Sequence, residues 1–97
     1  MPPFGRLDGI IVSSESLEEA TETARLIGRT APQVENMAVF GPAPAPMAML
    51  RGRHRQRLLV HAARSLDVQD VIRDWLGKLD WPRGVRVAVD VDPYSFL

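Results

Sequence analysis

An alternating pattern of arginines constrains the fold of this 97-residue chain more than any other feature. Arginine occupies every second position from residue 51 to residue 57, and the run passes directly into Leu58-Leu59-Val60. Successive side chains of a β-strand point to opposite faces of the sheet. The sequence therefore predicts a strand over 51–62 that presents four guanidinium groups on one face. These four residues are Arg51, Arg53, Arg55 and Arg57.

Three further segments have the composition or the alternation of strands. Residues 7–12 are a short segment that is β-branched towards its end, residues 37–40 are a brief apolar run, and residues 85–92 carry valine at every second position. The second of these runs ends at a glycine followed by the alternating prolines of segment 42–46. Three prolines withhold three backbone donors and favour an extended, polyproline-like path. Segment 42–46 therefore cannot form a central strand, and we expect the second strand to be short.

Two segments have the signals of helices. Ser16 and Glu19 have the spacing of a capping box, which predicts a first helix from Ser16 to about Gly28. Ser65 or Asp67 can cap a second helix, whose apolar residues recur at the helical period up to residue 79. These apolar residues are Val68, Val71, Ile72, Trp75, Leu76 and Leu79. Trp75 lies within this stripe, so we expect it in the core.

The order strand, helix, strand, strand, helix, strand favours a split β-α-β fold. This is the ferredoxin-like α+β class, a four-stranded antiparallel sheet with both helices on one face. We expect Leu58, Val60 and the valines of the last strand on the covered face, and the arginines, Asp90 and Asp92 on the open face. Leu59 shares the parity of the arginines. Either the open face becomes less exposed to solvent towards the C-terminal end of this strand, or the strand carries a β-bulge.

Composition limits the classes of function. The chain has 12 lysines and arginines and 12 aspartates and glutamates, so any attraction to nucleic acid must come from local clustering. There is no cysteine, which excludes disulfides and thiolate chemistry. The start lacks the features of a signal peptide, and no apolar run is long enough to span a bilayer. We expect one soluble intracellular domain over residues 1–97, without membrane contact.

Four segments together resemble a known family. They are the opening Pro2–Leu7, the proline-rich Gly41–Pro46, the basic run Arg51–Val60 and the ending Asp90–Leu97. In this order they are similar to the C-terminal domain of the PriA family. PriA, also called primosomal protein N-prime, is the replication-restart helicase of bacteria. The similarity covers almost the whole chain, and the closing Asp-Val-Asp-Pro-Tyr-Ser-Phe-Leu is its most specific part.

The resemblance implies that the chain is the C-terminal fragment of a larger ATP-dependent DNA helicase in the bacterial cytoplasm, associated with the nucleoid. ATP, magnesium and zinc are then expected only in the missing domains, because the chain has no phosphate-binding loop and no cysteine. The fragment itself is expected to have no catalytic activity and no cofactor. The family's C-terminal domain is of the ferredoxin-like class, helps to bind forked or branched DNA, and lies near the site for the acidic tail of single-stranded DNA-binding protein.

Two interpretations of the arginine strand remain open. Arg51, Arg53, Arg55 and Arg57 can bind DNA phosphates, which would release counterions and make binding salt-dependent. Alternatively, the arginines form a solvated sheet face that is partly neutralised by acidic residues. The candidates for neutralisation are Asp8, Asp90 and Asp92. In the second interpretation the domain is a structural or protein-interaction module that braces the helicase lobes.

Arg64 and Gln69 are the candidate partner-binding residues. They flank the start of the second helix, and the resemblance associates this region with the acidic tail of single-stranded DNA-binding protein. A helix N-terminus carries a partial positive charge that favours an incoming carboxylate.

No catalytic or metal-binding residues are predicted. His54 and His61 lie seven residues apart, on opposite faces of one expected strand, and no carboxylate or cysteine spacing completes a metal site. Asp90 and Asp92 share a face, but no nucleophile accompanies them. The apolar residues of segments 47–50 and 94–97 are expected to pack on this domain or to mark a seam with the helicase lobes.

Overall fold

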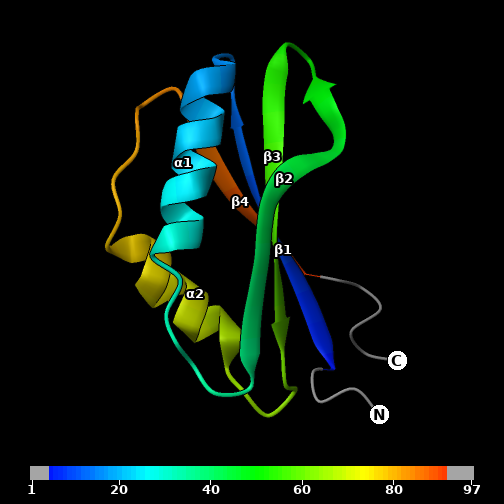
Figure 1. The fold of residues 1–97 in the computed structure, drawn as a ribbon, viewed down its shortest axis with the longest axis vertical. Helices are drawn as coiled ribbons and strands as arrows, with labels where there is room; N and C mark the ends of the chain where they lie inside the picture. The colour runs from blue at the N-terminus through cyan, green and yellow to red at the C-terminus, as the bar shows by residue number, and fades with distance from the viewer. Residues whose placement is uncertain (1–4, 92–97) are drawn as a thin grey trace.

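The computed structural model describes residues 5–91 and contains one four-stranded sheet and two helices. The elements are β1 (Arg6–Ser14), α1 (Leu17–Arg29), β2 (Met37–Leu50), β3 (Arg53–Ala62), α2 (Val68–Gly77) and β4 (Arg86–Val91). The strands lie in the order β2-β3-β1-β4, and every neighbouring pair is antiparallel. Both helices lie on the same side of the sheet (Figure 1). The ferredoxin-like α+β fold predicted from the sequence is confirmed.

The core lies between the helices and the covered face of the sheet. Strand alternation directs every second residue of β1 and β3 into it, and both helices add apolar residues, among them Ile27 of α1 and Trp75 of α2. The buried apolar residues of this cluster are Ile10, Val12, Ala24, Ile27, Leu58, Val60, Ala62, Val68, Ile72, Trp75 and Val85. Trp75 is 5% exposed, and its indole N–H donates to Thr30 Oγ1 at 3.1 Å. Its expected place in the core is confirmed.

The parity of β3 agrees with the prediction. Leu58 and Val60 are fully buried, whereas Leu59 faces the other side and pairs with Gly9 of β1 and Phe40 of β2. The register between β1 and β3 is continuous from residue 54 to residue 62. β3 therefore has no bulge against β1. Of the two explanations for Leu59, the correct one is that the open face is less exposed to solvent at this end of β3.

The second strand is longer than predicted. β2 does not end near Phe40 but continues through the prolines to Leu50, with register shifts between Phe40 and Ala43 and between Pro44 and Met49. Prolines are tolerated because β2 is an edge strand, where one side of the backbone needs no ladder donor. Gly41 makes the bend possible. Its φ is +105°, and a Cβ there would lie 2.9 Å from the carbonyl oxygen of Arg57.

The sequence predicted Arg51 as part of the arginine strand, and this prediction is wrong. Arg51 and Gly52 form the turn between β2 and β3, with φ of 52° and 77°, and β3 begins at Arg53. Positive φ at two successive residues is the signature of the tight hairpin turn that matches the twist of a two-stranded ribbon. The strand face therefore carries three arginines, and the fourth lies at the tip of the β2-β3 hairpin.

Local signals set both helix starts. Ser16 caps α1 by accepting a hydrogen bond from the Glu19 backbone N–H at 3.2 Å. Asp67, not Ser65, caps α2, because its carboxylate accepts from the Asp70 backbone N–H at 3.2 Å.

The last strand is only partly covered by the helices. Val87 and Val89 pair with Val12 and Ile10 and therefore share the covered face, as predicted, and Asp90 lies on the open face opposite Gly9. Val89 and Val91 are nevertheless each 40% exposed, because β4 is an edge strand. The predicted positions of Asp92 and of segment 94–97 lie outside the described residues.

Candidate nucleic-acid interface

The open face of the sheet gathers arginines from three parts of the chain. Arg53 and Arg55 alternate along β3, and Arg86 of β4 lies in the same cross-sheet row because Ser13 of β1 pairs with both Arg55 and Arg86. Arg51 joins them from the hairpin turn, and Arg57 continues the row along β3. We call this surface the arginine face. It consists of Arg51, Arg53, Arg55, Arg57 and Arg86.

Arg53 is fixed by the backbone at the end of β1. Its Nη2 donates to the carbonyl oxygens of Ser13 at 2.8 Å and Gly84 at 2.9 Å, and its Nε donates to Ser13 Oγ at 3.3 Å. These acceptors are neutral, so the guanidinium keeps its full positive charge while its position is restricted. A cation held in place in this way loses less side-chain entropy on binding an anion.

Arg55 holds the proline-rich part of β2 against the sheet. Its Nη1 donates to the carbonyl oxygens of Pro46 at 2.8 Å and Met47 at 3.1 Å. Met47 has a φ of +54°, so the backbone changes direction where Arg55 holds it. Arg55 thus has a structural role in addition to its charge.

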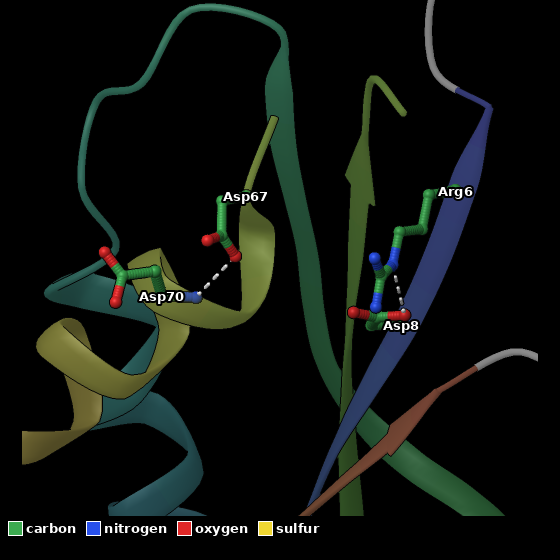
Figure 2. Close-up of polar contacts among 4 residues, drawn as sticks. All are labelled: Arg6, Asp8, Asp67 and Asp70. Carbon is green, nitrogen blue, oxygen red and sulfur yellow. Dashed lines mark hydrogen bonds and ion pairs between the residues drawn. The ribbon is translucent and has the colours of Figure 1, made fainter. Parts of the chain in front are cut away.

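Within residues 5–91, no ion pair joins the arginine face to a carboxylate. The three ion pairs observed there are Arg6–Asp8, Arg73–Asp70 and Lys78–Asp74. One of the two interpretations assumed that Asp8 neutralises the arginines. Asp8 forms no ion pair with them. Its side chain lies on the covered side of the sheet, fully buried, and accepts from Arg6 Nε at 3.3 Å (Figure 2).

Two surface pockets lie along the arginine face. The first, of about 380 Å³, is lined by Ser13, Glu15, Leu50, Arg51, Arg53, Arg55 and Arg86. Glu15 is the one carboxylate in this lining. The second, of about 650 Å³, runs over β1 and β3 beneath the curled part of β2, and Arg55 and Arg57 form part of its wall. We call this second pocket the sheet groove. Its remaining lining consists of Leu7, Asp8, Gly9, Ile11, Pro46, Met47, Leu59, Asp90 and Val91.

The two predicted partner-binding residues have different neighbours. Arg64 lies against Gly5 before β1, since a Cβ at Gly5 would be 3.0 Å from Arg64 Nε. Gln69 lines a groove of about 340 Å³ between α2 and β4. The N-terminus of α2 already receives the carboxylate of Asp67, and Asp70 adds a second acidic side chain in the first turn (Figure 2). The helix end is thus less attractive to an external carboxylate than the sequence suggested.

In the described part of the chain, no group of three or more histidine, cysteine, aspartate or glutamate side chains is placed to hold a metal ion. His54 and His61 lie on opposite faces of β3, as expected. No helix among residues 5–91 has the length and the apolar character needed to cross a membrane.

Comparison with known proteins agrees with the resemblance that the four sequence segments indicate. The sequence model of the family described as primosomal protein N C-terminal domain matches residues 1–94. The chain belongs to this family of PriA C-terminal domains. Replication restart protein PriA of Rickettsia felis is 33% identical over 96 residues, and that of Rickettsia conorii is 34% identical over 96 residues. The PriA protein of Treponema pallidum is 34% identical over 98 residues.

These alignments also define what part of a PriA protein the chain represents. Each covers 99% of this chain and 15% of the relative. The chain therefore spans a small part of the length of the PriA proteins that it matches. The resemblance predicted from the sequence is confirmed.

Sequence reasoning missed two features of the open face. The first is that Arg86 lies in one cross-strand row with Arg55, which requires the pairing of β1 with both of its neighbours. The aromatic contact between Phe40 and His61 joins β2 and β3, with ring centroids 5.1 Å apart. Phe40 alternates with the half-buried Val39, and this was the available sign that it faces the open side.

Proposed function

We propose that this PriA C-terminal domain binds DNA through phosphate contacts made by the arginine face, as an accessory domain of a larger replication-restart protein. One observation carries the proposal: four arginines of β3 and β4 share one sheet face, Arg51 of the adjoining turn lines the same pocket, and no carboxylate among residues 5–91 forms an ion pair with the five. The net charge of the chain is zero, so this local cluster supplies an attraction that the chain as a whole lacks. No catalytic role is proposed for the domain.

The expected mode of binding is positioning without base-sequence recognition. Arginines bind phosphate oxygens well because the planar guanidinium can donate two parallel hydrogen bonds. Such contacts fix the orientation of the nucleic acid but carry no sequence information. This mode suits forked or branched DNA, in which shape rather than sequence marks the substrate. ATP, magnesium and zinc are assigned, as a proposal, to the parts of PriA that this chain does not include.

Removal of three arginines is expected to weaken the binding of forked DNA and its dependence on salt. Arg51, Arg57 and Arg86 are changed together to glutamine, while Arg53 and Arg55 are kept because they also hold backbone carbonyls. Each lost phosphate contact lowers the slope of log K against log salt by about 0.9 on duplex DNA, so the slope should fall by about 2–3. Fluorescence anisotropy titrations with labelled forked DNA at several salt concentrations measure both quantities.

The matched control removes the same charge from the helical side. Arg25, Arg29 and Arg73 are exposed residues of α1 and α2, on the opposite side of the sheet from the arginine face. Changing these three to glutamine should leave the salt slope unchanged. An equal loss in both triple variants would show that general charge, not the arginine face, attracts the DNA.

We propose as a second candidate that the domain braces the helicase lobes and helps to receive the acidic tail of single-stranded DNA-binding protein. The groove that contains Gln69 supports this role. Its lining is mainly apolar, through Ile72, Leu76, Val89 and Val91, so it can accept the apolar residues of a tail or of a neighbouring domain. Arg64 would then meet a carboxylate outside the groove.

The second candidate predicts that Arg64→Ala lowers the affinity for an acidic-tail peptide by about tenfold, because a charge-assisted contact of roughly 1.4 kcal/mol is lost. The measurement uses the full-length PriA protein and a labelled peptide, because the remaining domains can complete the pocket. Arg25→Ala on α1 provides a control with the same loss of charge. Equal binding by the Arg64 variant and the unmodified protein would exclude Arg64 from the site.

A further inference from the structure

The open face changes character along β3. Its basic end carries Arg53, Arg55 and Arg57, and its other end carries Leu59 and His61. Phe40 of β2 lies opposite Leu59 and packs edge-to-face against His61, with an interplanar angle of 78°. Phe40 is nevertheless 54% exposed. An accessible aromatic ring therefore lies on the same sheet face as a row of cations.

The sheet groove connects these two ends. Arg55 and Arg57 contribute to its wall, and Leu59, which lies beside Phe40, contributes to its floor. Gly9 keeps the floor low between Leu59 and Asp90, because it has no side chain at the centre of the face. A Cβ at Gly9 would lie 3.8 Å from Arg57 Cδ, so the apolar stem of Arg57 lies over Gly9 at van der Waals distance. The groove thus has cationic and apolar parts along β3, and Asp90 adds one carboxylate from β4.

This arrangement matches the chemistry of single-stranded DNA. An unpaired strand offers a phosphate and an accessible base face in each nucleotide, whereas the bases of a duplex are stacked and present only their edges. Guanidinium groups can bind the phosphate while the aromatic and apolar surface receives the base. A purely apolar partner would leave the arginines without a counter-charge.

We propose that the open face binds single-stranded DNA, with a base stacked on the Phe40–His61 pair and an adjacent phosphate on Arg57. This inference rests on the proposed DNA-binding function and specifies the strand that the face accepts. Stacking is tolerant of base identity because every base has a π-face, so no sequence preference is expected. It also adds an affinity that does not depend on salt, unlike the phosphate contacts.

The test compares Phe40→Ala with the unmodified chain. Binding of a labelled single strand of about 12 nucleotides, and of a duplex of the same sequence, is followed by fluorescence anisotropy at several salt concentrations. Loss of one stacking contact should weaken single-strand binding by about 5- to 150-fold and leave its salt slope unchanged. Duplex binding should change less than twofold. Phe40→Trp should bind the single strand at least as well as the unmodified chain, because it keeps an aromatic surface.

Leu17→Ala is the matched control. Leu17 is 53% exposed, close to the value for Phe40, but it lies at the start of α1 on the helical side of the sheet. This variant should bind both DNAs as the unmodified chain does. A single strand that lacks bases should bind the unmodified chain as weakly as the complete strand binds Phe40→Ala.

The outcomes separate this inference from the proposed function. If the arginine variant loses salt-dependent binding while Phe40→Ala binds single strands normally, phosphate binding stands and base stacking is wrong. Equal weakening of single-strand and duplex binding by Phe40→Ala would also overturn the inference. If Phe40→Ala instead separates a dimer in sedimentation without affecting DNA, the aromatic pair is a contact between copies of the chain. If the unmodified chain binds neither DNA, both the proposed function and the inference fail.

Discussion

Replacing Arg6 with methionine is expected to destabilise the domain by about 3–5 kcal/mol, because it leaves the carboxylate of Asp8 buried without a counter-charge. The Asp8 side chain is 0% exposed, and Arg6 provides its one ion pair among residues 5–91. Asp8 Oδ2 has no hydrogen-bond partner in that part of the chain, so the carboxylate has little else to compensate its desolvation. Urea denaturation measures the free energy of unfolding of the variant and of the unmodified chain.

The double variant separates the lost pairing from the lost packing. With Arg6→Met and Asp8→Leu together, no charge remains buried, and the stability should return to within about 1 kcal/mol of the original or exceed it. Equal unfolding free energies for Arg6→Met and the unmodified chain would show that Asp8 does not depend on Arg6. A double variant as unstable as the single one would show that the apolar stem of Arg6, not its charge, matters.

Leu58→Ala is expected to cost about 3–5 kcal/mol of stability, because it opens a cavity at the centre of the covered face. Leu58 is fully buried, and its Cδ2 would lie 3.4 Å from a Cβ at Gly28, which shows how closely α1 packs on β3. The same substitution at the next residue provides the control. Leu59 lies on the open face and is half-buried, so Leu59→Ala should cost less than about 1 kcal/mol.

Thermal and urea unfolding of these two variants tests the assignment of faces directly. Adjacent leucines of one strand differ in exposure only because alternate side chains point to opposite sides. Similar losses at both positions would contradict the alternation on which the arginine face depends. A larger loss at Leu59 than at Leu58 would place the arginines on the side that the helices cover.

The order of elements was predictable because its signals are local. Apolar residues recur with a period of two in a strand and with a period near 3.6 in a helix. A helix cap is indicated by one polar side chain at a fixed spacing. Ser16 and the apolar stripe that includes Trp75 have these properties within a few residues of sequence. The burial of Asp8 was also available from the alternation, since Asp8 has the parity of Ile10 and Val12.

The length of β2 was not predictable from local signals. Proline opposes a strand wherever its missing N–H is needed, and whether it is needed depends on the side from which a neighbour pairs. In the fold, β2 is an edge strand whose end is also held by Arg55 through the carbonyls of Pro46 and Met47. A contact between residues eight or nine positions apart therefore overrides the local preference. Arg51 was assigned to the strand for a related reason, since the position of the turn depends on this pairing.

By itself the sequence determined the six elements, the two faces of β3 and the family to which the domain belongs. Each of these depends on the type and spacing of residues along the chain. The tertiary structure alone decided that Arg86 joins the arginine row, that Phe40 meets His61, and that Asp8 is paired with Arg6 and not with the row. These are relations between strands, set by register and by strand order, and one residue of slip in a register would move every side chain of that strand to the other face.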